Sequence, residues 1–219
     1  MKSKIILWTI IAVVVIGSIF GIVKLASKSK DLGSNSNTPV LTVSAINDNE
    51  NIKGNKDAKV VLIEYSDFQC PACASYYLIL KKVSEDLGDK VKFAYRHFPL
   101  PQHKNAKLAA TVAEAAGKQD KFWEMHDLIF QNQSDWSEEK NAAIIFAQYA
   151  QDLQLDLAKF QTDIASEEIK AKIENDSKSG TRAGVNSTPT FFLNGEKMTN
   201  PHNYDEFKNA IEQALGQSN

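Results

Sequence analysis

Cysteine is scarce in this sequence, because Cys70 and Cys73 are the only two among 219 residues. A closed zinc site needs four ligands, and the chain has no second CxxC motif. The chain has four histidines, and they do not form a compact ligand pair. They are His97, His103, His126 and His202. The sequence therefore argues against the interpretation that the two cysteines supply half of the ligands of a zinc site. We expect no metal ligand and no cofactor.

The sequence also lacks an excess of basic residues. The formal net charge is −2, with 25 basic and 27 acidic side chains. Five of the lysines lie in residues 1–30, which hold no acid, so residues 31–219 have 20 basic and 27 acidic side chains. An acidic body without a basic patch argues against binding to nucleic acid.

One long apolar run is present near the start of the chain. Ile5 to Val23 has no charged residue over about 19 positions, enough to span a hydrocarbon core of roughly 30 Å. A secretory signal peptide is the alternative, but its apolar region is usually about 7–15 residues long. We expect residues 1–30 to be an uncleaved transmembrane anchor with basic flanks. Residues 31–57, rich in Ser, Asn, Asp and Gly, then predict a flexible linker.

The segment around the two cysteines has the pattern of an α/β protein. Residues 59–65 are β-branched and almost continuously apolar, which predicts a strand covered on both faces. A helical pattern follows from Cys73 to about Leu87, and residues 91–98 alternate as a strand does. We therefore predict a strand–helix–strand unit that carries the cysteine pair at the start of its helix.

The rest of the chain predicts one domain, residues 58–219, interrupted by helices. From about residue 105 to residue 184 only helical patterns are found, which indicates a helical insertion. The pattern returns to β at residues 187–195 and ends with an amphipathic helix from Tyr204 to Leu215.

Within the insertion, the expected helices have few polar residues on one side. Ser137 can cap one of them, with Ile144, Ile145 and Ala147 on the inner side. Another holds Phe122, Trp123 and His126 at helical spacing. Such an aromatic cluster is more often packing than a functional site, so we expect it to belong to the core.

The spacing of the cysteines indicates a dithiol that can open and close. A cysteine at a helix start gains from the macrodipole and from free backbone N–H groups, which favour its thiolate. Cys73, one turn on, lies roughly 5–6 Å away along the helix, within the range of a disulfide. A structural staple and a chance pairing of buried cysteines are the alternatives, but so small a loop gives little stabilisation. A CxxC beside a strand–helix–strand pattern favours a redox site.

Glu64 is the exception in the apolar strand, six residues before Cys70. A buried charge is costly unless it is paired or protonated. Glu64 is therefore either a strand-end acid that reaches water or a proton acceptor for Cys73, with a pKa that burial raises.

These motifs together resemble a known family. Glu-x5-Cys-Pro-x-Cys after a buried strand, a helical insertion, and then Thr-Pro-Thr-Phe-Phe-Leu-Asn-Gly are similar to the DsbA-like thiol–disulfide oxidoreductases. The resemblance covers roughly residue 50 to the end, and is greatest to the membrane-anchored, BdbD-like kind in bacteria. It implies a thioredoxin-like fold with a helical insertion domain.

The resemblance also implies roles for individual residues. It makes Cys70 the exposed attacking thiolate and Cys73 the resolving thiol, and it places Glu64 at the buried acid of the family. It implies a cis peptide bond between Thr188 and Pro189 that faces the cysteines, with the Thr188 backbone pairing with substrate.

Substrate is also expected to contact Pro71 and Ala72, in the loop between the cysteines. Here the sequence departs from DsbA, because Pro-Ala replaces a Pro-His dipeptide. Thr188 is a second departure, at a position where DsbA has an apolar residue and isomerase-related members have threonine. Without the histidine cation we expect a less favoured Cys70 thiolate and a less oxidising pair.

The resulting interpretation is a membrane-anchored oxidoreductase on the extracytoplasmic side of a cell membrane. Its substrates would be reduced exported proteins, and the resemblance implies a quinone-linked membrane oxidoreductase as the partner that reoxidises it. A reductase or isomerase of the same fold, and an anchored binding module without catalysis, are the alternatives.

Overall fold

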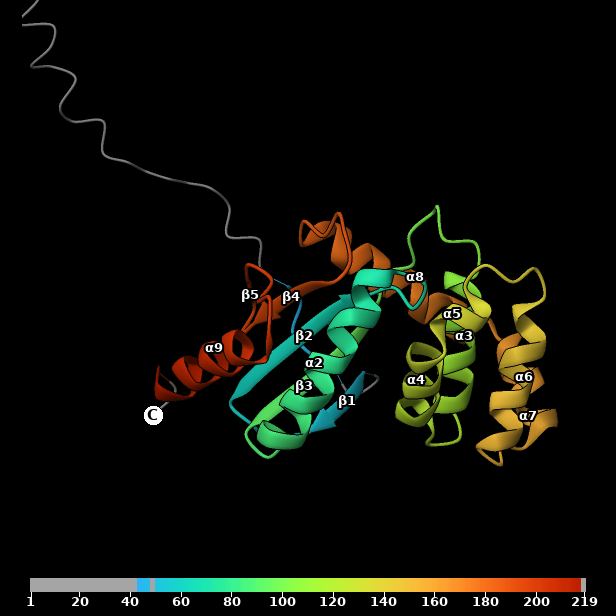
Figure 1. The fold of residues 1–219 in the computed structure, drawn as a ribbon, viewed down its shortest axis with the longest axis horizontal. Coiled ribbons are helices and arrows are strands. Elements are labelled where there is room, and N and C mark those ends of the chain that lie inside the picture. Colours follow the sequence, from blue (N-terminus) through green and yellow to red (C-terminus); the bar gives the residue numbers. More distant parts are fainter. Residues whose placement is uncertain (1–42, 48–49, 218–219) are drawn as a thin grey trace, which may run out of the picture. The chain divides into compact units, whose positions relative to one another are not determined.

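A computed structural model describes residues 43–47 and 50–217 of the chain (Figure 1). The expected anchor, Ile5 to Val23, lies outside these residues. Among the helices that are described, none has the length and apolar character needed to cross a membrane.

A five-stranded sheet forms the centre of the domain, with the strand order β1-β3-β2-β4-β5. Its strands are β1 (Asn51–Gly54), β2 (Val60–Ser66), β3 (Val91–His97), β4 (Thr190–Leu193) and β5 (Glu196–Lys197). The β2 and β3 strands run parallel, and the other neighbouring pairs run antiparallel. The helix α2 (Pro71–Leu87) connects the two parallel strands, so the predicted strand–helix–strand unit is confirmed.

The two faces of the sheet are covered by different helices (Figure 1). Val60 and Leu62 of β2 pack in one apolar core with residues of α2 and of α9 (Tyr204–Gln217). Ile63 and Tyr65 point to the other face, where the Tyr65 hydroxyl lies 2.7 Å from Ser179 Oγ of α8 (Glu167–Arg182). Because side chains alternate along a strand, Glu64 and Ser66 belong to the face under α2.

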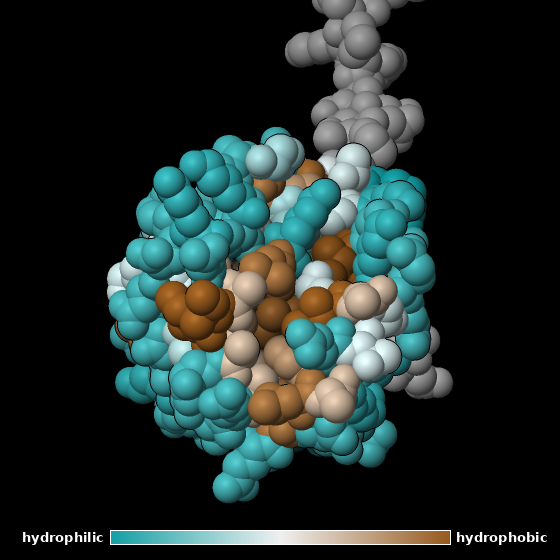
Figure 2. Space-filling model, turned by 90° about the vertical axis from the view of Figure 1, so that its right-hand side faces the viewer, coloured by the Kyte–Doolittle hydropathy of each residue, from teal (hydrophilic) through white to brown (hydrophobic). Residues whose placement is uncertain are grey.

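The predicted helical insertion is confirmed between β3 and β4. Its helices before α8 are α3 (Ala106–Gly117), α4 (Phe122–Gln131), α5 (Gln133–Trp136), α6 (Ala142–Asp152) and α7 (Leu157–Ile164). They enclose a core that includes the fully buried Trp136 and Phe146 and extends to both cysteines. Figure 2 views the domain from the side of α6 and α7, where apolar side chains gather at the centre of a mostly polar face.

One helix of the insertion was assigned the wrong inner side from the sequence. Helix α6 begins at Ala142, not near Ser137, and its N-cap is Asn141. Ile144 is 70% exposed and Ala147 is exposed as well, whereas Phe146 is buried. Ile145, the third residue expected to face inward, is partly buried against the core of the insertion. The buried positions of this helix follow the spacing i, i+4, i+7 and i+8 from Ala142, the usual repeat of an inward helix face, and Ile144 lies two residues off that stripe.

The expected linker, residues 31–57, contains a strand in its last part. The β1 strand pairs with β3 along its whole length. Just before it, Glu50 forms a bidentate ion pair with the buried Arg96, at 2.9 Å to Nε and 2.6 Å to Nη2. Arg96 also donates to the Ser44 carbonyl at 2.9 Å. The linker prediction was therefore wrong for residues 50–54, because backbone pairing and a buried cation hold a polar segment that has no apolar pattern.

Candidate active site

Cys70 lies at the N-cap of α2, where Pro71 occupies the first turn. Proline is favoured at that position because its missing N–H needs no partner there. The Cys70 backbone N–H donates to the Asp67 carbonyl at 3.0 Å. Gln133, from α5, donates to the carbonyls of Phe68 at 2.7 Å and Cys70 at 3.0 Å. The insertion thus fixes the loop that presents Cys70.

The side chain of Asp67 fixes the same loop from within. Its carboxylate accepts from the backbone N–H of Gln69 and of Leu100, each at 2.7 Å. Nδ1 of His103 lies 2.7 Å from the same carboxylate. The loop before Cys70 is therefore tied to the segment that follows β3.

The two cysteines differ in their access to solvent. Cys70 is 8% exposed and Cys73 is 0% exposed, while Pro71 and Ala72 between them are exposed. Cys70 is thus nearly buried and not exposed as expected, but it keeps a small opening to solvent beside two exposed residues, whereas Cys73 has none.

The predicted cis peptide bond between Thr188 and Pro189 is confirmed. The Cys70 sulfur lies 3.4 Å from the Thr188 carbonyl oxygen, to which it donates when it is protonated. The segment before β4 is therefore placed directly against Cys70, as the resemblance implied.

The environment strongly favours the thiolate of Cys70. Its pKa is lowered from 9.0 to about 5, mainly by a hydrogen bond from the Cys73 thiol. Burial opposes this shift, whereas the Thr188 side chain and the backbone N–H groups of Ala72 and Cys73 support it. Hydrogen-bond donors at the helix start therefore stabilise the thiolate although the loop lacks a histidine.

Cys73 has the opposite environment. Burial raises its pKa well above 9.0, and the hydrogen bond to Cys70 and the nearby Glu64 charge raise it further. At neutral pH the pair therefore holds one thiolate, on Cys70, and one thiol, on Cys73.

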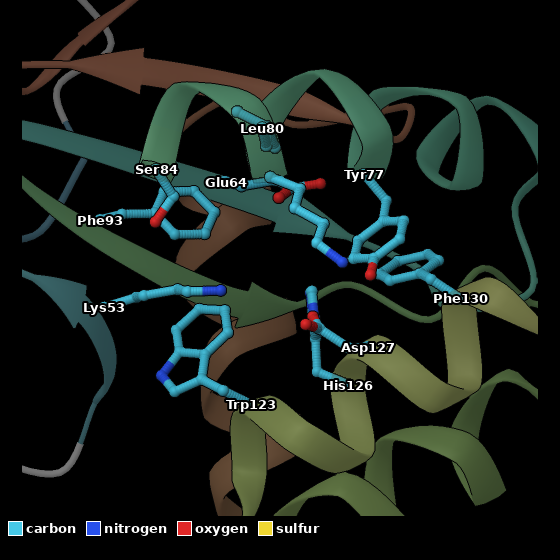
Figure 3. A pocket seen from close by; sticks show the side chains of 11 residues that line it. Lys53, Glu64, Tyr77, Leu80, Ser84, Phe93, Trp123, His126, Asp127 and Phe130 are labelled. Carbon is cyan, nitrogen blue, oxygen red and sulfur yellow. The ribbon is translucent and has the colours of Figure 1, made fainter. Parts of the chain in front are cut away.

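Glu64 is 2% exposed, so its carboxyl is buried and does not lie at a strand end in bulk solvent. Burial raises its pKa from 4.5 to about 8, while the Ser66 side chain opposes the shift and the Cys70 charge adds to it. The carboxyl group lines a small cavity with about 20 Å³ of space for water. Lys53, His126 and Asp127 point into the same space from the other side (Figure 3).

The aromatic cluster of the insertion packs behind the cysteines, as expected for a core. His126 contacts the rings of Tyr95, Trp123 and Phe130, each with centroids 5.0 Å apart. Burial lowers the pKa of His126, and its Nδ1 lies 2.9 Å from Asp127 Oδ1. No group of three or more metal-ligating side chains occurs within residues 43–47 and 50–217.

Sequence reasoning missed two polar residues that face Cys73. Ser66 lies two residues after Glu64 on the same strand, and Tyr95 is the β3 partner of Glu64 in the strand register. The two-residue period of β2 could have indicated Ser66. Tyr95 could not have been found without the register between strands.

Comparison with known proteins places this fold in a family. A family model described as thioredoxin matches residues 47–213. The crystal structure of oxidised BdbD from Bacillus subtilis superposes with a TM-score of 0.67 at 28% identity, covering 76% of this chain and 93% of that one. The α-DsbA1 structure from Wolbachia pipientis, at 23% identity, has a TM-score of 0.69 and covers 78% of this chain and 94% of that one, which shows the fold alone.

Longer proteins match the same domain in sequence. The Na⁺/H⁺ antiporter NhaA 3 of Salinispora tropica is 33% identical over 185 residues, covering 84% of this chain and 28% of that protein. NhaA 1 of Mycolicibacterium vanbaalenii is 33% identical over 170 residues, covering 75% and 26%. The chain thus spans about a quarter of the length of these curated relatives. The matched domain and its fold make this chain a member of the thioredoxin family, with the architecture of the DsbA-like thiol–disulfide oxidoreductases.

Proposed function

We propose that the protein introduces disulfides into reduced proteins by exchange at Cys70 and Cys73. One observation carries the proposal: the accessible Cys70 has a pKa lowered to about 5, while the pKa of the inaccessible Cys73 is raised. A stable thiolate is a good leaving group in exchange, and stabilising the reduced form makes the disulfide a stronger oxidant.

The reaction begins with the oxidised pair. A substrate thiolate attacks the sulfur of Cys70, the Cys70–Cys73 bond breaks, and a mixed disulfide forms. Cys73 leaves as a thiolate and takes a proton from the Glu64 carboxylic acid. A second substrate thiolate then attacks the substrate sulfur of the mixed disulfide, and Cys70 leaves as its stable thiolate. Two electrons pass from the substrate to the enzyme.

Pro71, Ala72, Thr188 and Pro189 form the proposed contact surface for substrate. The Thr188 carbonyl beside Cys70 supports this role, since a substrate chain that pairs with the Thr188 backbone brings its sulfur to Cys70. Main-chain pairing is tolerant of sequence, which suits an enzyme that acts on many reduced proteins.

The setting is also a proposal. Residues 1–30 anchor the domain to a cell membrane, on its extracytoplasmic side, where disulfides persist. A quinone-linked membrane oxidoreductase restores the disulfide by taking the two electrons. Fractionation of cells that make the full chain tests the anchor: the protein is expected in the membrane fraction, and release of the full-length chain into the soluble fraction would contradict it.

Substitution of the cysteines tests the exchange itself. The Cys70→Ser protein is expected to lose oxidation of a reduced test protein, because the accessible sulfur is absent. The Cys73→Ser protein is expected to accumulate mixed disulfides, seen as reductant-sensitive adducts on gels. A Cys70→Ser protein that still oxidised the test protein would rule the scheme out.

A further inference from the structure

Three buried side-chain oxygens in the described part of the chain form no hydrogen bond of ordinary length, namely the hydroxyls of Ser66, Tyr95 and Thr188. The Thr188 hydroxyl still helps to lower the pKa of Cys70. All three surround the cysteine pair. The Thr188 carbonyl lies 3.4 Å from Cys70, and the other two lie under α2 beside Cys73. Buried polar groups are nearly always paired, so orphans that gather at one site need an explanation there.

Ser66 is the member of this cluster that lies on the same strand as Glu64, and it is 1% exposed. It shares one face of β2 with Glu64, which is paired with Tyr95 in the strand register. Cys73 on α2 covers the same face and, like Tyr95, is 0% exposed. The Ser66 hydroxyl lowers the pKa of Glu64, of Cys73 and of Tyr95, although it forms no hydrogen bond of ordinary length with any of them.

We propose that the Ser66 hydroxyl relays a proton between Cys73 and Glu64, and that the Tyr95 hydroxyl positions it. This rests on the proposed function, in which Glu64 exchanges a proton with Cys73. A hydroxyl can do this because it donates one hydrogen bond and accepts two. Neither hydroxyl is hydrogen-bonded in the structure. In the proposed relay the phenol of Tyr95 moves to donate to the Ser66 oxygen, which leaves the serine proton directed at the carboxylate.

The step balances in protons and electrons. When Cys73 attacks a mixed disulfide at Cys70, its thiol proton passes to the Ser66 oxygen as the serine proton passes to the Glu64 carboxylate. The Cys73 thiolate then forms the bond to Cys70, and the other thiolate leaves. The reverse path returns the proton to Cys73 when a substrate opens the disulfide.

Other ionisable groups face Glu64 from each element packed against it. They are Lys53 of β1, Tyr77 and Lys81 of α2 with both cysteines, Tyr95 of β3, and His126 and Asp127 of α4. Lys53, Tyr77, Lys81, His126 and Asp127 line a cavity with Glu64. This cavity has space for about one water molecule, which gives the carboxyl a contact for exchanging its proton with solvent.

The test follows both cysteines in one reaction. The reduced full-length protein is mixed with an aromatic disulfide whose released thiolate is coloured. Attack by Cys70 releases one coloured thiolate in a first phase. Attack by Cys73 on the resulting mixed disulfide releases a second one, and a high reagent concentration speeds the first attack so that the second is the slower phase. The second phase therefore reports the Cys73 deprotonation, and the first phase is an internal control for folding and for Cys70.

Ser66→Ala is expected to slow the second phase about tenfold and leave the first unchanged, a smaller loss than the ~10²–10⁴-fold typical of removing a general base. In a Glu64→Gln background the same substitution is expected to have no further effect. In Ser66→Ala with Glu64 present, the rise of the second-phase rate with pH is expected to shift to higher pH, because the missing hydroxyl normally lowers the Glu64 pKa.

Tyr95→Phe is expected to slow the second phase in the otherwise wild-type protein. It is expected to have no added effect in a protein that already carries Ser66→Ala.

Tyr149→Phe is the matched control, because it removes a phenol hydroxyl from α6 in the insertion. It is expected to leave both phases unchanged. A Ser66→Ala protein with a normal second phase, or with the same loss in the Glu64→Gln background, would overturn the relay. A wild-type protein that releases only one coloured thiolate per molecule would instead contradict the proposed function, and the relay with it.

Discussion

At the scale of single residues, the site depends on two sulfurs with opposite environments and one buried acid. The helix start and the Cys73 thiol stabilise the charge on Cys70. Burial keeps the proton on Cys73 and on Glu64. In water the two thiols would have the same pKa, and the carboxyl would be ionised at neutral pH. The pKa shifts in the fold give the two thiols different protonation states and keep the proton on the carboxyl, and such shifts are common at active sites.

The buried acid has a measurable cost in stability. The unfolded chain ionises Glu64 above pH 4.5, whereas the folded protein keeps the proton up to about pH 8. Unfolding then releases a proton, so the contribution of Glu64 to the free energy of unfolding falls as pH rises through this window. One pKa unit corresponds to about 1.4 kcal/mol, so the full cost is of order 5 kcal/mol.

Glu64→Gln is therefore expected to stabilise the protein above pH 4.5, by an amount that grows until about pH 8. Urea unfolding of both reduced proteins across this range gives the difference directly. Glu138→Gln, at an exposed position, is the control, with an expected change below about 0.5 kcal/mol. A difference between Glu64→Gln and wild type that is the same at pH 4 and pH 8 would contradict the buried carboxyl.

At the scale of elements, α8 closes the face of the sheet opposite to α2. Gly180 of α8 lies against Tyr65 of β2, since an added Cβ at this glycine would lie 2.8 Å from Phe98 and 2.9 Å from Tyr65. Tyr65 cannot move away easily, because its hydroxyl accepts from Arg96 at 2.9 Å and lies 2.7 Å from Ser179. The absence of a side chain at residue 180 thus sets the distance between helix and sheet.

Gly180→Ala is accordingly expected to destabilise the protein by about 1–3 kcal/mol, the usual cost of overpacking. Gly216→Ala is the matched control in α9, since an added Cβ there would meet no atom within 4 Å. It is expected to be neutral or to stabilise by up to about 1 kcal/mol, because alanine is the better helix former. Equal midpoints in urea for the two variants would show that α8 and β2 are not in close contact.

Sequence reasoning found the elements that are continuous in the chain. The apolar β2 strand, the helix that begins after Cys70 and the return to β at Thr190 were all readable from local patterns. The β1 strand was missed because residues 51–54 have no apolar alternation, and their partners on β3 are about forty positions away. The inner face of α6 was misassigned because a helix can be apolar at positions that the fold leaves exposed.

The candidate site was predictable to the same extent. Cys70, Cys73, Glu64 and the Thr188–Pro189 bond come from motifs. The buried hydroxyls of Ser66 and Tyr95 depend on which strand neighbours β2 and in which register. The Asp67 contacts with Leu100 and His103 likewise join segments about 35 residues apart. Such tertiary pairings leave no local signal in one sequence.

At the scale of the whole molecule, the fold places one accessible, stabilised thiolate over one buried thiol, and the direction of electron flow follows from that difference. A pair whose reduced form is stabilised by a thiolate of low pKa accepts electrons readily. The missing histidine in the loop removes one source of this stabilisation, and the hydrogen bonds to Cys70 supply another.

The reduction potential of the Cys70–Cys73 pair, measured by equilibrium with glutathione buffers, tests the account most directly. We expect a value closer to the roughly −120 mV of DsbA than to the roughly −270 mV of thioredoxin. A value at or below that of thioredoxin would mean that the protein donates electrons to disulfides, and would contradict its proposed role as a source of them.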